Sequence, residues 1–182
     1  MNTLKLVLPN VTHKEIIMDY KEEFIKNEDS MDGTAGLSTY KTFEEWYEAF
    51  NDNLNEETVR AGLVPATTYL ALDESEKLIG MIDIRHRLND HLLNFGGNIG
   101  YSVRKSERRK GYATEMLKLA LEKCIELNIK KVLVTCDKNN IGSAKTIIAN
   151  GGIIENEVFD PNDNTMTQRY WVTLKLEEKQ SS

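Results

Sequence analysis

The sequence predicts an α/β domain built on a mixed, mostly antiparallel seven-stranded sheet, with one central parallel βαβ pair and about four helices. Strands predicted at 98–104 and 131–136 flank a segment with helical periodicity. This pattern makes a βαβ unit whose strands run parallel and whose crossover is right-handed. A turn sequence at 160–164 separates two further predicted strands, about 153–159 and 166–176, which predicts an antiparallel hairpin.

Length and composition indicate an ordinary globular protein. The chain has 182 residues and no repeat, low-complexity segment or composition break, so residues 1–182 are expected to form a single domain. Hydrophobic residues make up 40% of the chain and charged residues 29%, which is typical of a globular domain. The formal net charge of -6 argues against a general nucleic-acid binder, because such a protein needs a basic face over much of its surface.

Targeting signals and cysteine usage favour a cytoplasmic protein. The stretch Met1–Lys5 lacks a signal-peptide pattern, and no apolar run approaches the ~18 residues of a membrane span. Cys124 and Cys136 lie in apolar segments and are too few for a disulfide or metal framework. We therefore expect reduced, buried thiols, no metal and no membrane contact.

The first half of the chain predicts a short strand and two helices. Leu4–Leu8 is an apolar run closed by proline and is expected to be an edge strand. Thr12–Glu15 and Thr42–Glu45 have the capping-box pattern, so a helix is expected to begin at each. The segment between them, 27–41, is rich in Asn, Asp, Ser, Gly and Thr, which predicts a loop.

The remaining elements follow from changes of periodicity. Strands are expected at 67–72 and 77–87, separated by a turn rich in Asp and Glu. From Gly111 the apolar residues take i, i+3, i+4 spacing, which predicts an amphipathic helix. Asn139 or Asn140 can cap a last helix at 141–149, which ends at a Gly-Gly pair.

A basic loop precedes the helix that follows Gly111. Residues 104–110 hold five Lys or Arg against one Glu, and a helix N-terminus adds about half a positive charge. A solvated basic turn is one interpretation, and a nucleotide phosphate loop is another, although its glycine pattern is absent. The diphosphate site of coenzyme A is a third interpretation. It needs a glycine, small residues at the helix start and flanking cations, and all three are present.

The loop resembles that of the GNAT superfamily of acyl-CoA-dependent N-acyltransferases. The run Arg108-Arg109-Lys110-Gly111-Tyr112-Ala113 fits the family pattern Gln/Arg-x-x-Gly-x-Gly/Ala, and Asn140-Ile141-Gly142-Ser143 is similar to its downstream Asn-x-x-Ala/Ser element. The order of elements agrees from about residue 4 to 176. The region around the loop looks most like a group of bacterial predicted acetyltransferases, from whose pattern it departs at Asn98 and Lys105.

The resemblance implies a set of coenzyme contacts. The backbone of Val103 is expected to bind pantetheine where the strand separates from its parallel neighbour. The amides and cations of the loop would hold the diphosphate, and Asn140 and Ser143 would lie near the coenzyme, although Asn140 can equally serve as a helix cap. The residues implicated in the loop are Arg108, Arg109, Lys110, Gly111, Tyr112, Ala113 and Thr114.

Transfer of an acetyl group to an amine requires a base and stabilisation of the thioester oxygen, but no protein nucleophile. Asn98 stands where members of the superfamily often have Glu or His, and its amide could hold a water or the amine. His86 and Asp83 are alternative titratable groups, and Tyr101 is a candidate hydrogen-bond donor. His86 can also be structural and Tyr101 a core residue. The family's proton-donating tyrosine aligns with Ile147.

These features predict an acetyl-CoA-dependent N-acetyltransferase that acts by direct attack in a ternary complex. A non-catalytic acyl-CoA sensor is the alternative, which Ile147 and Asn98 favour. The acceptor, a small-molecule or peptide amine, is expected to meet the first two helices, the loop 27–41 and the final hairpin. The acidic stretch Glu22–Asp32 would attract a cationic amine or is simply solvated. A homodimer is compatible with the sequence, whereas nucleic-acid and membrane partners are not expected.

Overall fold

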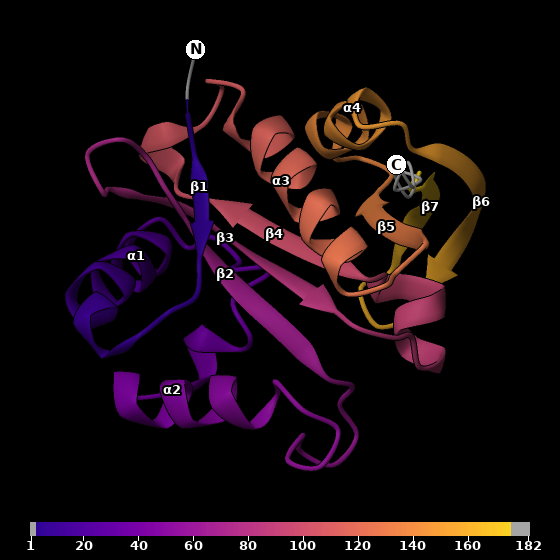
Figure 1. Cartoon of the computed structure of the whole chain (residues 1–182). Helices are drawn as coiled ribbons and strands as arrows, with labels where there is room; N and C mark the ends of the chain where they lie inside the picture. Colours follow the sequence, from indigo (N-terminus) through magenta and orange to yellow (C-terminus); the bar gives the residue numbers. More distant parts are fainter. Residues whose placement is uncertain (1–2, 176–182) are drawn as a thin grey trace, which may run out of the picture.

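One mixed sheet organises the molecule (Figure 1). The computed structural model describes residues 3–175. Within that range the strand order is β1-β2-β3-β4-β5-β7-β6, and every pairing is antiparallel except that of β4 with β5. The strands are β1 Lys5–Val7, β2 Ala66–Leu72, β3 Leu78–Arg85, β4 Ile99–Val103, β5 Lys131–Asp137, β6 Ile153–Asp160 and β7 Thr165–Thr173. The predicted α/β class, the central parallel pair and the C-terminal hairpin are confirmed.

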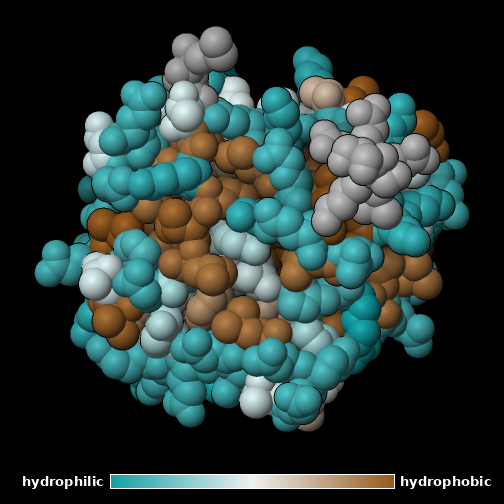
Figure 2. Space-filling model, viewed as in Figure 1, coloured by the Kyte–Doolittle hydropathy of each residue, from teal (hydrophilic) through white to brown (hydrophobic). Residues whose placement is uncertain are grey.

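Helices cover both faces of the sheet and enclose two apolar cores. The helices are α1 Lys14–Lys26, α2 Phe43–Asp52, α3 Tyr112–Glu126 and α4 Ile141–Ala149. One core lies between the sheet and α1 and α2, and Trp46 and Phe24 are fully enclosed in it. The other lies between the sheet and α3 and α4, around Met116 and Ile147. In the view of Figure 2, hydrophilic residues cover the rim of the molecule and hydrophobic residues gather toward its middle.

Strands β4 and β5 separate almost as soon as they meet. In the part of the chain that the structure describes, their register contains one pair, Ile99 with Val134. The amide of Asn98 holds the strands at that point: its Oδ1 accepts from the N–H of Leu133 at 2.9 Å, and its Nδ2 donates to the carbonyl of Arg85 at 3.1 Å. Beyond this bridge a gap opens between the two strands.

The antiparallel register of β3 and β4 decides which main-chain groups face that gap. The N–H of Arg104 donates to the carbonyl of Ile79 at 3.0 Å, so alternate residues of β4 are bonded to β3. Backbone groups point to opposite edges at successive strand positions. The N–H and C=O groups of Tyr101 and Val103 therefore face the gap beside β5.

The loop between α1 and α2 lies directly on β4. Gly33 has a φ of 72°, and a Cβ there would lie 2.3 Å from the carbonyl oxygen of Gly100. Only glycine permits so close an approach in this backbone conformation. The predicted loop 27–41 is thus held against the strand that borders the gap, and it contains one short 3₁₀ turn, Leu37–Thr39.

One of the two predicted capping boxes is wrong. The sequence Thr12–Glu15 does not cap α1, because Asn10 already caps a 3₁₀ turn at Val11–His13 that leads into the helix. The Oδ1 of Asn10 accepts from the N–H of Thr12 at 2.8 Å. The other prediction holds for the N-cap: the hydroxyl of Thr42 accepts from the N–H of Glu45 at 3.2 Å. In α4 the cap is Asn140, whose Oδ1 accepts from the N–H of Ser143 at 3.1 Å.

Two predicted strand ends differ from the structure by two residues or more, and a π-helical turn was not predicted. β3 ends at Arg85 rather than at 87, although the N–H of His86 still donates to the carbonyl of Pro65 at 2.8 Å, in register with the β2–β3 pairing. β7 ends at Thr173, and the predicted end of that strand at 176 lies outside the described residues. A π-helical turn, Leu92–Gly96, connects β3 to β4, and its carbonyls bind side chains from three strands.

Both cysteines are free and buried, as predicted. Burial raises the pKa of the Cys124 thiol to about 12 and that of Cys136 to about 11, so neither is a thiolate at neutral pH. None of the helices in the described range is long and apolar enough to cross a membrane. The same range contains no cluster of three His, Cys, Asp or Glu side chains suited to a metal ion.

Candidate active site

A groove lies where β4, the N-terminus of α3 and the N-terminus of α4 meet, and its volume is about 280 Å³. Nine of the ten residues that the sequence suggested for coenzyme binding line it. They are Val103, Arg108, Arg109, Gly111, Tyr112, Ala113, Thr114, Asn140 and Ser143. The tenth, Lys110, is not among the lining residues, and its Nζ lies 2.9 Å from the carboxylate of Glu107, which does line the groove. Two separate segments of the chain, 101–114 and 140–146, thus line one cavity.

The floor of the groove is an open helix N-terminus. Gly111 is the N-cap of α3 and has no side chain to occupy the first N–H groups of the helix, whereas Thr42 and Asn140 cap α2 and α4. Gly111 has a φ of 82°, and a Cβ placed on it would meet no atom within 4 Å, so the space beside this residue is open. Arg109 also has positive φ, 64°. Left-handed residues next to a helix start form a concave set of N–H donors that suits an anion.

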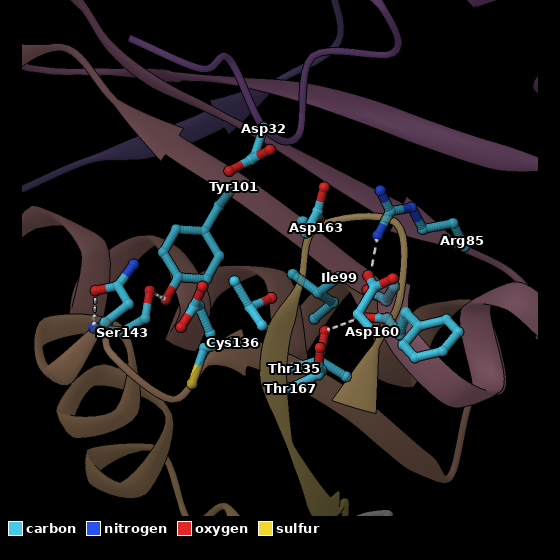
Figure 3. A pocket seen from close by; sticks show the side chains of 16 residues that line it. Asp32, Arg85, Ile99, Tyr101, Thr135, Cys136, Ser143, Asp160, Asp163 and Thr167 are labelled. Atoms are coloured by element: carbon cyan, nitrogen blue, oxygen red, sulfur yellow. Dashed lines mark hydrogen bonds between the residues drawn. The ribbon is translucent and has the colours of Figure 1, made fainter. Parts of the chain in front are cut away.

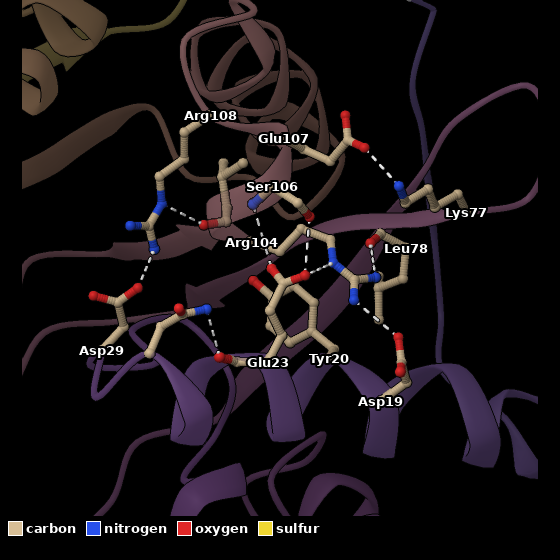
Figure 4. A network of polar contacts seen from close by, with 12 residues as sticks. Asp19, Tyr20, Glu23, Asp29, Lys77, Leu78, Arg104, Ser106, Glu107 and Arg108 are labelled. Atoms are coloured by element: carbon tan, nitrogen blue, oxygen red, sulfur yellow. Dashed lines mark hydrogen bonds and ion pairs between the residues drawn. The ribbon is translucent and has the colours of Figure 1, made fainter.

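The basic side chains of the loop are divided between different partners. Arg108 donates from Nε to the carbonyl of Val103 at 2.9 Å, and its Nη2 lies 3.1 Å from a carboxylate oxygen of Asp29 (Figure 4). Arg108 thereby links the groove to the loop between α1 and α2. Arg104 belongs to the same basic run in sequence but is buried on the other side of β4, where it pairs with Asp19 and Glu23 of α1 at 2.8 and 3.2 Å.

A second cavity, of about 310 Å³, adjoins the groove and is lined by carboxylates (Figure 3). We call it the acidic cavity. Its four acids come from three parts of the chain: Asp32 from the loop after α1, Asp137 from the end of β5, and Asp160 and Asp163 from the hairpin. One cation, Arg85 at the end of β3, also lines it. The excess of negative charge favours a cationic guest.

Burial changes the pKa of Asp32, the acid that the loop after α1 contributes to the cavity. The pKa of Asp32 is raised, mainly because its carboxylate is desolvated. The nearby Asp163 carboxylate adds to the rise, while Arg85 opposes it. A carboxylate with a raised pKa is a better proton acceptor than an ordinary aspartate.

Arg85 is fixed at the edge of the acidic cavity. Its Nε lies 3.2 Å from Asp83, and its Nη1 donates to the carbonyl of Gly96 in the π-helical turn at 3.2 Å. A Cβ at Gly100 would lie 3.0 Å from the guanidinium, so the glycine leaves room for it. Burial raises the pKa of Asp83, although Arg85 and a hydrogen bond from Thr68 oppose the rise.

Three residues line both the groove and the acidic cavity: Tyr101, Asn140 and Ser143. The phenol oxygen of Tyr101 lies 3.0 Å from the hydroxyl oxygen of Ser143, so a hydrogen bond joins β4 to α4 across the junction (Figure 3). Burial raises the pKa of Tyr101, which keeps the phenol protonated at neutral pH.

The other two suggested catalytic residues lie away from this junction. His86 is hydrogen-bonded to the hydroxyl of Thr67 at 2.8 Å and lines neither the groove nor the acidic cavity. The buried amide of Asn98 is engaged by the main chain of Arg85 and Leu133, as described above. Sequence reasoning overlooked the acids of the hairpin and Arg85. Their signal was the pair of aspartates in the turn 160–164 and an arginine at a strand end.

The family of the chain follows from its match to known domains. Residues 6–152 match the acetyltransferase (GNAT) domain, which covers most of the sequence. The chain belongs to the GNAT acetyltransferase family. The resemblance noted in the sequence is therefore confirmed. No curated protein sequence matches this GNAT chain.

Solved structures share the GNAT fold over nearly the whole chain. A ribosomal L7/L12 α-N-protein acetyltransferase in complex with coenzyme A has a TM-score of 0.70 at 16% identity, covering 94% of each chain. A spermidine N-acetyltransferase from Vibrio cholerae, in complex with CoA and spermine, has a TM-score of 0.64 at 15% identity, covering 93% of this chain and 95% of its own. A microcin C7 self-immunity acetyltransferase with acetyl-CoA and AMP has a TM-score of 0.62 at 18% identity, covering 94% and 92%.

The environment of His86 predicts a pH-dependent contribution to stability. Burial lowers the pKa of His86 below the usual value of about 6.5, although Asp83 and Glu56 oppose the shift. The unfolded chain therefore binds this proton more readily, and His86 reduces the free energy of unfolding as the pH falls below about 6.5. We expect His86→Gln to lose less stability than wild type between neutral pH and pH ~5.5 in urea titrations. Equal losses in the two proteins would contradict the shift.

Proposed function

We propose that this GNAT chain transfers an acetyl group from acetyl-CoA to a primary amine, by direct attack of the amine in a ternary complex. The observation that carries the proposal is the junction of two unlike sites. A groove with an open helix N-terminus and flanking cations meets a cavity lined by carboxylates. The first suits an anionic coenzyme and the second a cationic amine.

The groove fits coenzyme A by the chemistry of its walls. The first N–H groups of α3, together with Arg109, would hold the diphosphate, because the space beside Gly111 is open. The pantetheine arm would enter the gap between β4 and β5, where the backbone of Val103 faces it. The Val103 carbonyl already accepts from Arg108. Its N–H is the group that pantetheine would use.

The reaction requires the protein to position the two substrates and to stabilise the charge that develops on the thioester, but it requires no protein nucleophile. The thioester is activated by the coenzyme, and the raised pKa values of both cysteine thiols argue against a thiolate nucleophile. As the amine attacks, the carbonyl oxygen gains negative charge and needs a fixed N–H donor. The N–H of Tyr101 faces the gap at this point and is the donor we assign.

The acidic cavity would receive the acceptor as an ammonium ion. Its carboxylates concentrate cations, and Asp32, with its raised pKa, is suited to take the proton that the amine must lose before attack. We assign Asn98 a positioning role at the point where β4 and β5 separate. His86 is hydrogen-bonded to Thr67 and lines neither the groove nor the acidic cavity, so we assign it no catalytic role. The solved relatives bound to spermine or acting on a protein N-terminus support an amine acceptor.

The activity is tested by thiol release from acetyl-CoA with a panel of amines. We expect release that depends on the amine and is fastest with linear diamines and polyamines, because the acidic cavity attracts them. Calorimetry with acetyl-CoA measures binding separately. A protein that binds acetyl-CoA but releases thiol with no amine would be the sensor domain and not an enzyme.

The loop assignment is tested by two matched glycine variants. Gly111 and Gly151 have φ values of 82° and 89°, and a Cβ at either meets no atom within 4 Å. Both Gly111→Val and Gly151→Val should lose roughly 1–2 kcal/mol of stability, because each places a side chain in a left-handed conformation. Only Gly111→Val should raise the dissociation constant of CoA, by about tenfold or more. Equal CoA affinities in the two variants would show that the diphosphate does not bind at this loop.

The acceptor assignment is tested by removing one carboxylate. Asp163 is exposed in the hairpin turn and lines the acidic cavity, so Asp163→Asn should raise KM for a linear diamine about threefold at low salt and leave kcat unchanged. Glu48→Gln makes the same charge change on the exposed side of α2 and serves as the control. If both variants shift KM alike, the effect is one of net charge and the acceptor does not lie in the acidic cavity.

A further inference from the structure

The acetyl group must pass from coenzyme to amine at the junction of the groove and the acidic cavity. Three side chains line both: Tyr101, Asn140 and Ser143. The amide of Asn140 has no acidic proton, and its Oδ1 already accepts from the main chain of Ser143. The hydroxyls of Tyr101 and Ser143 are therefore the groups at the junction that can give up a proton, and they lie 3.0 Å apart (Figure 3).

We propose that the Tyr101 hydroxyl protonates the departing coenzyme sulfur, with Ser143 as the relay that restores its proton. The inference rests on the proposed acetyl transfer. The lone pair of the amine nitrogen forms the new N–C bond, the C–S bond breaks, and its electron pair goes to sulfur. The Tyr101 O–H proton moves to that sulfur, giving the free thiol. The nitrogen loses a second proton after the N–C bond forms, the first having gone to Asp32 before attack. This second proton returns through Ser143 to the phenolate, so that acetyl-CoA and the neutral amine give amide and CoA with no other reactant.

Tyr101 can supply a donor to each of the two thioester atoms that gain negative charge, the carbonyl oxygen and the sulfur. The N–H of Tyr101 faces the gap between β4 and β5, where the thioester oxygen would lie. Its side chain crosses to the first turn of α4 and ends at Ser143. An oxygen and a sulfur attached to the same carbon can therefore each meet a donor from this one strand position.

Alternative donors near Tyr101 are poorly suited. The groups that face its phenol are Asp32 from the loop after α1, Cys136 from β5, and Ser143 and Thr146 from α4. Asp32 is already assigned the proton of the ammonium ion in the proposed reaction, and Ser143 and Thr146 contact the phenol itself. The thiol of Cys136 lies 3.8 Å from the side-chain oxygen of Gln168 on β7. One turn further along α4, Ile147 is fully buried and has no proton to give.

The first test separates chemistry from binding. Tyr101→Phe should lower kcat about 10²-fold, the lower end of the loss expected for a general acid, with little change in KM for the amine or in the dissociation constant of CoA. Ser143→Ala should lower kcat about tenfold, since water can replace a relay, and Ser143→Thr should restore most of the loss. Tyr47→Phe, a matched change on α2, should behave as wild type. A Tyr101→Phe variant with wild-type kcat would overturn the proposal.

The second test reads the hydrogen bond to sulfur directly. A donor at the sulfur stabilises the thiolate, so bound CoA should titrate at a lower pH in wild type than in Tyr101→Phe, as followed by the ultraviolet absorbance of the thiolate. Identical titrations would overturn the role of Tyr101 while leaving the acetyltransferase intact. A wild-type protein with no amine-dependent thiol release would instead overturn the proposed function, and the role of Tyr101 with it.

Discussion

The separation of β4 from β5 is the constraint on which the site depends. The two strands share a single pair within residues 3–175, Ile99 with Val134, and then diverge. A continuous parallel ladder would have used the outward N–H and C=O groups of Tyr101 and Val103 for strand pairing. The side-chain amide of Asn98 stabilises the divergence, because it hydrogen-bonds main-chain groups of both neighbouring strands at the point where the ladder stops. The gap is therefore a stable feature of the sheet.

The groove is positively charged and the adjoining acidic cavity is negatively charged. The two charges come from different kinds of structure. The positive side is made mostly by main-chain amides at the start of α3, since Arg108 is shared with Asp29 and Lys110 with Glu107. The negative side is made by aspartate side chains from loops. Main-chain donors are fixed by the fold, whereas loop carboxylates are free to vary in number and position. A family can thus keep one coenzyme site and change its acceptor.

The sequence predicted the elements with local signals and missed those that depend on distant contacts. The helix after Gly111, the strand 131–136 and the hairpin have clear periodicity or turn residues, and all are present. The cap at Thr12 failed because Asn10, two residues earlier, competes for the same helix start. The π-helical turn at Leu92–Gly96 has no local pattern, since it is held by side chains from β3, β5 and β7. Likewise, the acidic cavity forms only when the loop and the hairpin converge.

The contact between Gly33 and Gly100 has a consequence for how such a protein can diversify. The segment that carries Asp32 rests on the main chain of β4 with no side chain between them. Any remodelling of that segment for a new substrate must keep a residue without a Cβ at position 33, or else displace the strand that carries Tyr101. A change of acceptor through this loop is therefore limited by the geometry that acyl transfer requires of β4. A loop taken from a relative will fit only if the glycine at position 33 and its contact with Gly100 are kept.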